Sequence, residues 1–263
     1  MLIEQIWTNS PLRNFNYLVA CPETCEALVI DPLDAQRCLG IASDKGWRIR
    51  QILNTHEHPD HIQGNEALVK STGARVLAHC NAADKIPHLD IPLRANSLVK
   101  VGSSVEFRVL DTPGHTMSHI CLFSDAQIPV LFSGDTLFNA GVGHCYLGGH
   151  PHELYRTLST QLTALPDTTR LYPGHDYIAN NLRFTLAREP GNQKAAELLS
   201  QVLNQDPSSA LITTLGLEKQ VNCFFRLDNP EIIENLKPVV PELPKNPDPQ
   251  AVFLALRELR NKW

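Results

Sequence analysis

The sequence predicts an α+β fold in which a β-rich region precedes a helical region. Two observations support this class. Short apolar segments separated by turn residues occupy the chain up to about residue 175, and apolar residues recur at helical spacing from about residue 176 onward. A chain of 263 residues can form one large domain or one domain with an appendage. We therefore expect one domain at residues 1–175 and a helical domain at residues 176–263.

The first half of the β-rich region alternates strands with helices. Gly46 and Gly73 each follow a segment of helical spacing, and glycine is suited to end a helix. This alternation implies a sheet with helices on its outer face. The expected strands are residues 2–7, 16–20, 27–30, 49–53 and 75–78, and the expected helices are residues 34–45 and 65–71.

Further strands follow, and three of them end at a polar element. These elements contain His115, Asp135 and His175, and two of them read Pro-Gly-His. One Pro-Gly-His is an ordinary turn, but three polar elements after apolar runs are difficult to attribute to turns alone. Because loops at the ends of successive strands meet at one edge of a sheet, we expect these side chains to converge. The expected strands here are residues 99–102, 106–110, 120–123, 129–132 and 170–172.

The region from about residue 176 is predicted to be helical. Five prolines in residues 238–249 exclude a helix there, so we expect an extended strap. Asp248 and Pro249 then supply an N-cap and a first-turn proline for a final helix. On this helix Arg257 and Arg260 lie three residues apart, so their guanidinium groups can meet. The expected helices are residues 178–188, 192–204 and 232–236, and on the final helix the apolar residues Val252, Leu256, Leu259 and Trp263 are expected to fall on one face.

Composition narrows the class of function. The net charge of -5 and the pI near 6.1 argue against a nucleic-acid-binding protein, because phosphate backbones are bound by clustered basic residues. No apolar stretch approaches the roughly 18 residues of a membrane span, and the first residues lack the order of a signal peptide. The seven cysteines are an odd number without CxxC spacing, which fits reduced thiols. We therefore expect a cytoplasmic protein that acts on neither membranes nor nucleic acids.

Residues 55–61, Thr-His-Glu-His-Pro-Asp-His, concentrate metal-binding side chains after an apolar run. Because side chains alternate along an extended backbone, His56 and His58 point to the same side and can reach one ion. Pro59 then turns the chain and allows a helix to begin, which directs Asp60 and His61 toward a second ion. The competing interpretation is a polar helix cap with incidental histidines, which does not explain so many ligands in six residues.

Seven candidate ligands result: His56, His58, Asp60, His61, His115, Asp135 and His175. They suffice for two sites of three ligands, with one carboxylate left to bridge. Imidazole and carboxylate suit zinc, and also iron or manganese. Two ions about 3.5–4 Å apart would share and acidify a water molecule and hold a carbonyl or phosphoryl oxygen, which is the chemistry of a hydrolase. A mononuclear redox site would leave several of the seven unused.

Other catalytic motifs are absent. The chain has no HExxH, no GxxxxGK[ST] and no GxSxG. Gly141-Val142-Gly143 is interpreted as a flexible turn. The histidines outside the seven have no comparable spacing and are interpreted as ordinary polar residues or as residues that support the ligands, with the role of His144 left open.

Residues 55–61 resemble the HxHxDH signature of the metallo-β-lactamase superfamily, and the three later ligands match its order. Within the superfamily, the chain resembles the glyoxalase II (hydroxyacylglutathione hydrolase) family over nearly its whole length. The resemblance is carried by residues 134–138, 173–177, 181–184, 189–192 and the basic terminal helix.

The resemblance implies an αββα four-layer sandwich followed by a helical domain that closes over the substrate. A bridging hydroxide would attack the thioester carbonyl of an S-(2-hydroxyacyl)glutathione such as S-D-lactoylglutathione, with Asp60 and Asp135 as catalytic carboxylates. Zinc is the first choice for the two divalent cations. One metal would be held by His56, His58 and His115, the other by Asp60, His61 and His175, and Asp135 would lie between them.

The resemblance also implies how glutathione is bound. Tyr146, Tyr177, Arg257 and Arg260 fall at matching positions, and the arginines can form two parallel hydrogen bonds to a carboxylate. The chain departs from the family pattern at two places. His144 replaces a cationic residue, and Leu147 replaces an acidic one. Losing one charge-assisted hydrogen bond weakens binding by about 1.5–3 kcal/mol, so an altered substrate preference is expected.

Three alternatives remain open at this point. The chain could be another hydrolase of the superfamily, such as a lactonase or an enzyme for a different thioester. It could be a mononuclear iron dioxygenase acting on glutathione persulfide. It could also bind metal and glutathione without turnover. The helical last third favours the thioesterase, and the complete ligand set disfavours the non-enzyme. As an enzyme for a small molecule, the protein is expected to be a monomer or a weak oligomer.

Overall fold

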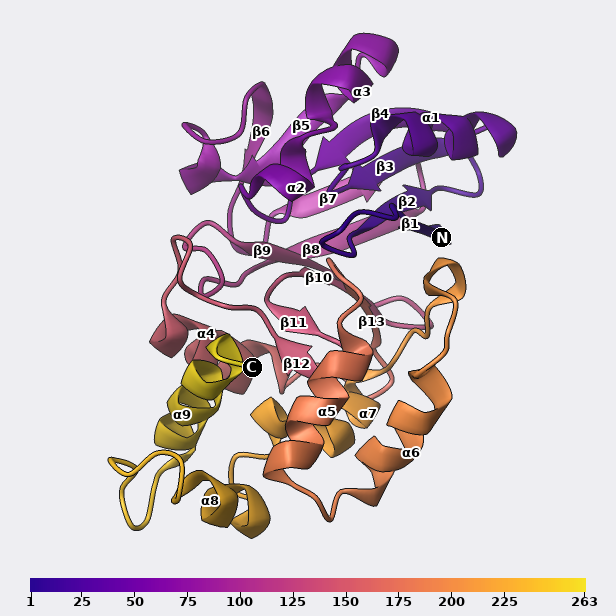
Figure 1. Ribbon diagram of the computed structural model, residues 1–263. Helices are drawn as coiled ribbons and strands as arrows, with labels where there is room; N and C mark the ends of the chain where they lie inside the picture. The colour runs from indigo at the N-terminus through magenta and orange to yellow at the C-terminus, as the bar shows by residue number, and fades with distance from the viewer.

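The protein consists of two β-sheets packed face to face, with helices on both outer faces (Figure 1). The computed structural model describes residues 1–263. The layers run helix, sheet, sheet, helix, which confirms the four-layer αββα architecture. The helices after residue 176 lie together at one end of the molecule in Figure 1.

The first sheet has six strands in sequential order, from β1 to β6. The first three pair antiparallel and the last three pair parallel to their neighbours. The strand at its edge, β6, contains Pro92, which is tolerated there because an edge strand need not donate every hydrogen bond. The six strands are β1 (Leu2–Trp7), β2 (Phe15–Ala20), β3 (Glu26–Ile30), β4 (Arg48–Leu53), β5 (Arg75–His79) and β6 (Leu89–Leu93).

The second sheet has five strands in the order β13, β10, β9, β8, β7. Only β10 and β13 are parallel. A two-stranded hairpin, β11–β12, follows β10. The strands are β7 (Leu98–Val101), β8 (Val105–Asp111), β9 (Ile120–Ser124), β10 (Val130–Gly134), β11 (Leu137–Phe138), β12 (Gly141–Val142) and β13 (Arg170–Pro173).

Several helices begin at a side-chain cap that the sequence supplies. Asp34 caps α1, Asn192 caps α6 and Asp248 caps α9, each accepting a hydrogen bond from a backbone N–H in the first turn. The helices are α1 (Ala35–Asp44), α2 (Pro59–Ile62), α3 (Asn65–Thr72), α4 (Pro151–Thr157), α5 (Ile178–Arg188), α6 (Gln193–Val202), α7 (Leu215–Val221), α8 (Pro230–Leu236) and α9 (Pro249–Asn261). Short 3₁₀ turns lie at Cys80–Ala82, Pro207–Ser209 and Cys223–Phe225, and Leu158–Leu162 is a π-helical turn.

The apolar core is divided by the sheets. Side chains such as Leu28, Phe107 and Phe132 fill the space between the two sheets. A second cluster joins α1 and α3 to the outer face of the first sheet. A third cluster covers the outer face of the second sheet, where Phe123 and Leu131 pack with residues of α4, α5, α8 and α9. The helical region therefore shares its core with the second sheet.

Two helices were not predicted. Leu154, Leu158 and Leu162 recur at helical spacing after Pro151 and are buried, so the signal for α4 was present. The helix α7 begins at Thr214, whose hydroxyl accepts from the N–H of Leu217. One detail of the final helix is wrong. The helix α9 ends at Asn261, so Trp263 lies beyond it; the side chain is 49% exposed and its indole donates to Asn180.

The hairpin β11–β12 is held by side chains of the helical region. Glu218 of α7 accepts from the N–H of Ala140 and from the hydroxyl of Thr213, each at 2.7 Å. Ala140 has a left-handed backbone (φ 57°), which costs an alanine roughly 1–2 kcal/mol. Asn222 donates to the carbonyl of Gly141 at 3.2 Å, and Asn181 to that of Asn139 at 2.9 Å. These bonds fix the loop that continues to His144.

Glu218 is expected to make stability depend on pH. Burial raises the pKa of its carboxyl to about 7, against 4.5 for an ordinary glutamate, although its hydrogen-bond donors oppose the shift. Between these values the folded state keeps the proton that the unfolded chain has lost, so unfolding becomes easier as pH rises from about 4.5 to 7. The expected loss is about 3 kcal/mol, and Glu218→Gln should abolish it in urea titrations at several pH values.

Glu242→Gln is the matched control, since Glu242 is exposed. If Glu218→Gln and Glu242→Gln keep the same pH dependence as the parent protein, the buried carboxyl does not contribute.

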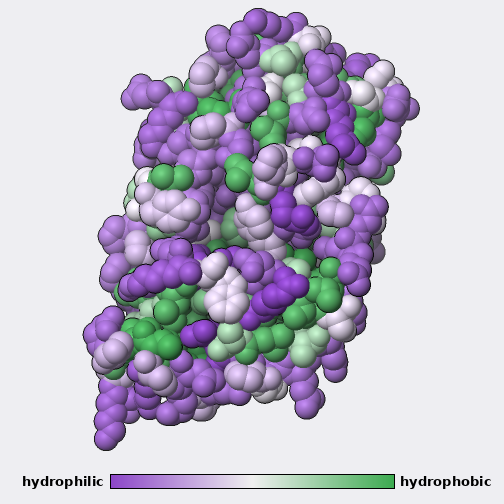
Figure 2. All heavy atoms as spheres, viewed as in Figure 1, coloured by the Kyte–Doolittle hydropathy of each residue, from purple (hydrophilic) through white to green (hydrophobic).

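The surface in Figure 2 is mostly hydrophilic, and apolar side chains gather chiefly in its lower part, where the C-terminal helices lie. No helix combines the length and the apolar character needed to cross a membrane.

Candidate metal centre

The seven candidate ligands meet at one end of the sandwich, between the sheets. Each follows a strand or begins the short helix that comes after one. The loop after β4 carries His56 and His58, and α2 carries Asp60 and His61. The loops after β8, β10 and β13 carry the other three: His115, Asp135 and His175.

His56, His58 and His115 form a first trio. Nδ1 of His58 lies 3.0 Å from Nε2 of His56 and 3.0 Å from Nε2 of His115. All three ligand atoms lie within 4.8 Å of one another. His56 and His115 are buried, and His58 is partly exposed.

Asp60, His61 and His175 form a second trio. The Nε2 atoms of His61 and His175 are 3.2 Å apart, and Oδ2 of Asp60 lies 3.5 Å from each. Asn14 donates to the same oxygen of Asp60 at 2.8 Å, which holds the carboxylate toward the histidines. Nothing in the sequence around Asn14 indicated this contact.

Asp135 lies between the two trios. Its Oδ2 is 3.6 Å from Nε2 of His115 and 3.1 Å from Nε2 of His175, and its Oδ1 is 3.5 Å from Nε2 of His61. Oδ1 is buried and has no hydrogen-bond partner. A buried carboxylate oxygen is costly when unpaired, so this atom is suited to a cation.

The hydrogen bonds on the outer side of the rings fix where the protons are. His115 and His175 each donate from Nδ1 to a backbone carbonyl at 2.7 Å, and His58 donates from Nε2 to the carbonyl of Leu147 at 3.0 Å. A carbonyl can only accept, so the opposite ring nitrogens carry lone pairs that face one another. Nδ1 of His58 and Nε2 of His115 are such a pair, 3.0 Å apart, and their lone pairs repel unless a cation lies between them. The residues therefore fit metal ions.

The pKa values of the side chains at the centre are also shifted in directions that suit a bound cation. Burial lowers the pKa of His56 and His115 well below the usual value, which keeps them neutral and able to coordinate. Burial also opposes the charge of His61, but the Asp135 and Asp31 carboxylates outweigh it and raise its pKa to about 10. Burial of Asp135 is likewise outweighed by His175 and His61, which lower its pKa well below the usual value. The carboxylates thus favour positive charge here.

Asp31 contacts the candidate ligands, and sequence reasoning missed it. Its carboxylate accepts from the N–H and the hydroxyl of Thr55 at 2.7 and 2.6 Å and from Nδ1 of His61 at 3.0 Å. It therefore connects the loop after β3 to both parts of the histidine cluster. The signal was its position directly after the apolar strand β3, the same signal that identified Asp135.

His119 supports the centre without facing it. Its ring stacks on that of His56 with centroids 5.1 Å apart, and its Nε2 accepts from the N–H of Asp135 at 3.1 Å. Burial lowers the pKa of His119 to about 3, so it stays neutral and can accept. This agrees with the interpretation of His119 as a supporting residue.

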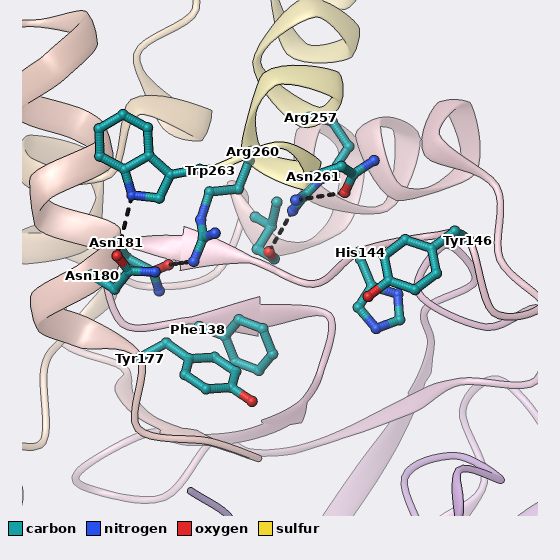
Figure 3. Close-up of a pocket in the computed structure, with 11 residues that line it drawn as sticks. Phe138, His144, Tyr146, Tyr177, Asn180, Asn181, Arg257, Arg260, Asn261 and Trp263 are labelled. Carbon is teal, nitrogen blue, oxygen red and sulfur yellow. Dashed lines mark hydrogen bonds between the residues drawn. The ribbon is translucent and has the colours of Figure 1, made fainter. Parts of the chain in front are cut away.

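A cavity of about 280 Å³ opens next to the centre and is lined by both the β-rich and the helical regions (Figure 3). His144 and Tyr146 stack with centroids 3.8 Å apart, and burial lowers the pKa of His144 to about 4. Tyr177 stacks on His175, with centroids 5.0 Å apart. The lining residues are Phe138, Val142, His144, Tyr146, Tyr177, Asn180, Asn181, Arg257, Arg260, Asn261 and Trp263.

The two arginines of α9 have different environments. Arg257 is buried and donates from Nη1 to the carbonyls of Val142 and Gly143 at 2.8 and 2.9 Å. Burial lowers its pKa to about 10. Arg260 is half-buried and donates to Asn181 at 3.0 Å. Figure 3 shows the two side chains leaving the same helix toward different partners, so they do not act as one pair.

The interpretation of residues 141–143 as a flexible turn is wrong. Gly141 and Val142 form β12, and the glycines are required by close packing. A Cβ atom on Gly141 would overlap the side chain of Asn181, and one on Gly143 would overlap the carbonyl of Asp135.

Comparison with known proteins agrees with this geometry. Residues 12–175 match the model of the metallo-beta-lactamase superfamily, and residues 176–263 match that of the hydroxyacylglutathione hydrolase C-terminus. The chain is 60% identical to a hydroxyacylglutathione hydrolase of Nitrosococcus oceani and 55% identical to one of Polaromonas sp., each over the full length of both chains. It also resembles the crystal structure of ETHE1 from Myxococcus xanthus, with a TM-score of 0.68 and 27% identity over 99% of this chain and 98% of that one.

The matches cover both the β-rich region that holds the candidate ligands and the helical region that completes the cavity. The chain therefore belongs to the hydroxyacylglutathione hydrolase (glyoxalase II) family of the metallo-β-lactamase superfamily.

Proposed function

We propose that this protein hydrolyses S-(2-hydroxyacyl)glutathione thioesters, S-D-lactoylglutathione among them, to a 2-hydroxy acid and glutathione. The observation that carries the proposal is the placement of two ligand trios, with Asp135 between them, beside a cavity lined by aromatic rings and guanidinium groups. We further propose that residues 1–175 form a catalytic domain that holds the metal ligands, and that residues 176–263 form a helical domain that completes the glutathione site.

The residues fit two divalent cations. We assign one to the first trio and one to the second, with Asp135 within reach of both. Zinc suits this set of nitrogen and oxygen ligands, as do iron and manganese. Two such cations, when bound, acidify water near neutral pH and polarise the thioester carbonyl.

The protein's own residues position the reaction. Asp60 is 20% exposed at its side chain, so it reaches the edge of the centre, where it would orient the attacking water. The water oxygen forms a bond to the thioester carbon, the bond from carbon to sulfur breaks, and the sulfur leaves with its electron pair. The attacking water gives up one proton to solvent and the glutathione thiolate takes up one proton from solvent, so the products are the 2-hydroxy acid and the thiol. Because a thiol has a pKa near 8.5, its thiolate is a good leaving group, and no protein acid is needed.

The cavity suits the tripeptide. Arg260 is the basic side chain there that is not committed to the backbone, so we assign it to a glutathione carboxylate. We assign Tyr146 and the neutral His144 to contacts along the peptide. Burial raises the pKa of Tyr177, so its hydroxyl stays protonated and donates to the carbonyl of Leu12 at 2.8 Å. Its ring is left to face the cavity.

Arg260→Ala is expected to affect substrate binding, whereas Arg257→Ala is expected to affect the stability of the protein. Loss of Arg260 should raise KM for S-D-lactoylglutathione by about tenfold with little change in kcat, because one charge-assisted hydrogen bond is lost. Loss of Arg257 should lower the free energy of unfolding by about 3 kcal/mol, because two buried carbonyls lose their donor. Steady-state kinetics and urea unfolding on both variants measure the difference. Equal effects of the two variants on KM would contradict the assignment.

Steady-state hydrolysis of S-D-lactoylglutathione, with metal content measured on the same sample, tests the proposed function. Turnover that disappears when a chelator removes the metal is the expected result. No thioester hydrolysis by protein that holds two metal equivalents would reject the proposal. Oxygen consumption with glutathione persulfide, and hydrolysis of lactones, then test the alternatives within the superfamily.

A further inference from the structure

The carboxylate of Glu57, which lies between two candidate ligands in the chain, joins two of the loops that carry the first trio. Its Oε2 accepts hydrogen bonds from the hydroxyls of Thr116 and Ser118 at 3.0 and 2.8 Å. The acceptor belongs to the loop after β4, and both donors belong to the loop after β8, where Thr116 directly follows His115. One side chain therefore links two loops that each supply ligands to the same ion.

Glu57 is also held from a third loop. Its Oε1 pairs with Nζ of Lys85 at 2.5 Å, and Lys85 lies between β5 and β6. The side chain of Glu57 is 9% exposed and that of Lys85 is 51% exposed, so the carboxylate is almost buried while the ammonium group reaches solvent. A carboxylate that is almost buried and accepts three hydrogen bonds has little freedom to move. Its position can therefore fix the positions of the loops that bind it.

The loop after β8 is bonded internally around His115. The N–H of Gly114 donates to the carbonyl of Thr116 at 2.9 Å, which closes a turn with His115 at its middle. At the end of the loop, the N–H of Ile120 donates to the carbonyl of Thr55 at 2.8 Å. A displacement of this segment therefore moves the imidazole of His115.

The separation of the two loops sets the geometry of the first trio. Nδ1 of His58 and Nε2 of His115 are 3.0 Å apart, and one ion must be reached by both. Imidazole nitrogens lie about 2.0–2.1 Å from a bound zinc ion, so small changes in the distance between the loops change the affinity for the ion.

The second trio has supports of its own. Asn14 donates to Asp60 at 2.8 Å, and Asp31 accepts from Nδ1 of His61 at 3.0 Å. The remaining ligand of this trio donates to a backbone carbonyl in the loop between β1 and β2 at 2.7 Å. None of these contacts involves Glu57, so they persist when its carboxylate is removed.

We propose that Glu57 is a positioning residue for the first metal ion. Its carboxylate holds the loop of His58 against the loop of His115, and its removal weakens the ion at the first trio while the second ion stays bound. Both oxygens of Glu57 are bonded to protein donors, so it acts through other side chains and is not itself a ligand. The inference rests on the proposed function only in the assignment of one divalent cation to each trio.

Titration of the metal-free protein with cobalt(II) tests the proposal without turnover. Equilibrium dialysis counts the bound ions, and the visible absorption of cobalt follows each binding step. His58→Ala removes a ligand of the first trio and so identifies the step that belongs to the first ion. Glu57→Ala should weaken that step by about 10–100-fold and leave the other step unchanged.

Glu57→Gln should restore binding of the first ion. Both hydroxyl groups donate to Oε2, and the single oxygen of a glutamine amide can accept both hydrogen bonds. The first step should therefore stay close to that of the parent protein, although the ion pair with Lys85 is lost. A loss as large as that of Glu57→Ala would show that charge, and not the link between the loops, is what matters, and would overturn the proposal.

The donors provide the complementary test. Thr116→Val combined with Ser118→Ala should weaken the first step as Glu57→Ala does, and adding Glu57→Ala should cause little further loss, because the three residues act through one link. The double variant carries the test if Glu57→Ala does not fold.

Glu66→Ala is the matched control, since Glu66 pairs with Lys70 at 2.5 Å on the exposed surface of α3. It should keep both binding steps. An equal loss of both steps in Glu57→Ala, or a first step unchanged from that of the parent protein, would overturn the proposal.

The number of bound ions separates this inference from the proposed function. A parent protein that binds fewer than two ions contradicts the assignment of a cation to each trio and rejects the inference with it. Two bound ions without hydrolysis of S-D-lactoylglutathione reject the thioesterase function alone, because the titrations of the Glu57 variants still decide the role of the carboxylate.

Discussion

Replacing Asp135 with alanine is expected to abolish thioester hydrolysis and to release metal. Asp135 lies between the two trios, with its oxygens 3.1–3.6 Å from nitrogens of His61, His115 and His175. Removing a partner that only orients a ligand costs about 10–100-fold in metal affinity, and a group placed at both sites should cost more. Elemental analysis after dialysis, together with the rate on S-D-lactoylglutathione, measures both effects.

Asp125→Ala is the matched control, because Asp125 is exposed in the turn after β9. It should retain the metal and the activity of the parent protein. Full metal content in Asp135→Ala would show that the carboxylate is not needed to hold either ion, and the arrangement proposed above would then be incorrect.

Asp31→Ala is expected to lower both the stability of the protein and its affinity for metal. The substitution leaves the N–H of Thr55 and Nδ1 of His61 without their acceptor, although both are buried. Loss of such a network should lower the free energy of unfolding by on the order of 3 kcal/mol. It should also weaken metal binding by about 10–100-fold, because the ring of His61 is no longer oriented.

Competition with a chromogenic chelator measures the affinity, and urea unfolding measures the stability. Asp31→Asn should recover part of both, since its amide oxygen can still accept one of these hydrogen bonds. Asp44→Ala serves as control at an exposed position of α1. If Asp31→Ala binds metal as tightly as the control, the ring of His61 is oriented by other contacts.

The sequence was informative about the centre because its residues follow apolar strands. His115, Asp135 and His175 were selected by that rule, and the structure brings them to the cluster of residues 55–61. Sequence alone could not decide which of several acidic residues after a strand faces the centre. Asp31 and Asp111 carry the same local signal, yet Asp31 is buried against His61 while Asp111 is 41% exposed and lies 3.6 Å from His79.

Other features could not be predicted because they depend on contacts between distant segments. The role of Arg257 in holding the backbone of residues 142–143 follows from the packing of α9 against β12, and helical spacing does not reveal it. The glycines at 141 and 143 were interpreted as flexible for the same reason, whereas their neighbours Asn181 and Asp135 leave no room for a side chain. The strand β6 was missed because Pro92 disfavours a strand unless it lies at an edge.

The shared core of α4, α9 and the second sheet has a consequence for synthesis of the protein. When a ribosome has released only the first 175 residues, Phe123, Leu131 and their neighbours have no helices of the last third to cover them. That apolar sheet face would be open to chaperones or to a second nascent chain until α9 emerges from the ribosome. Synthesis of α9, rather than completion of the sandwich, then sets the moment at which this sheet face is covered.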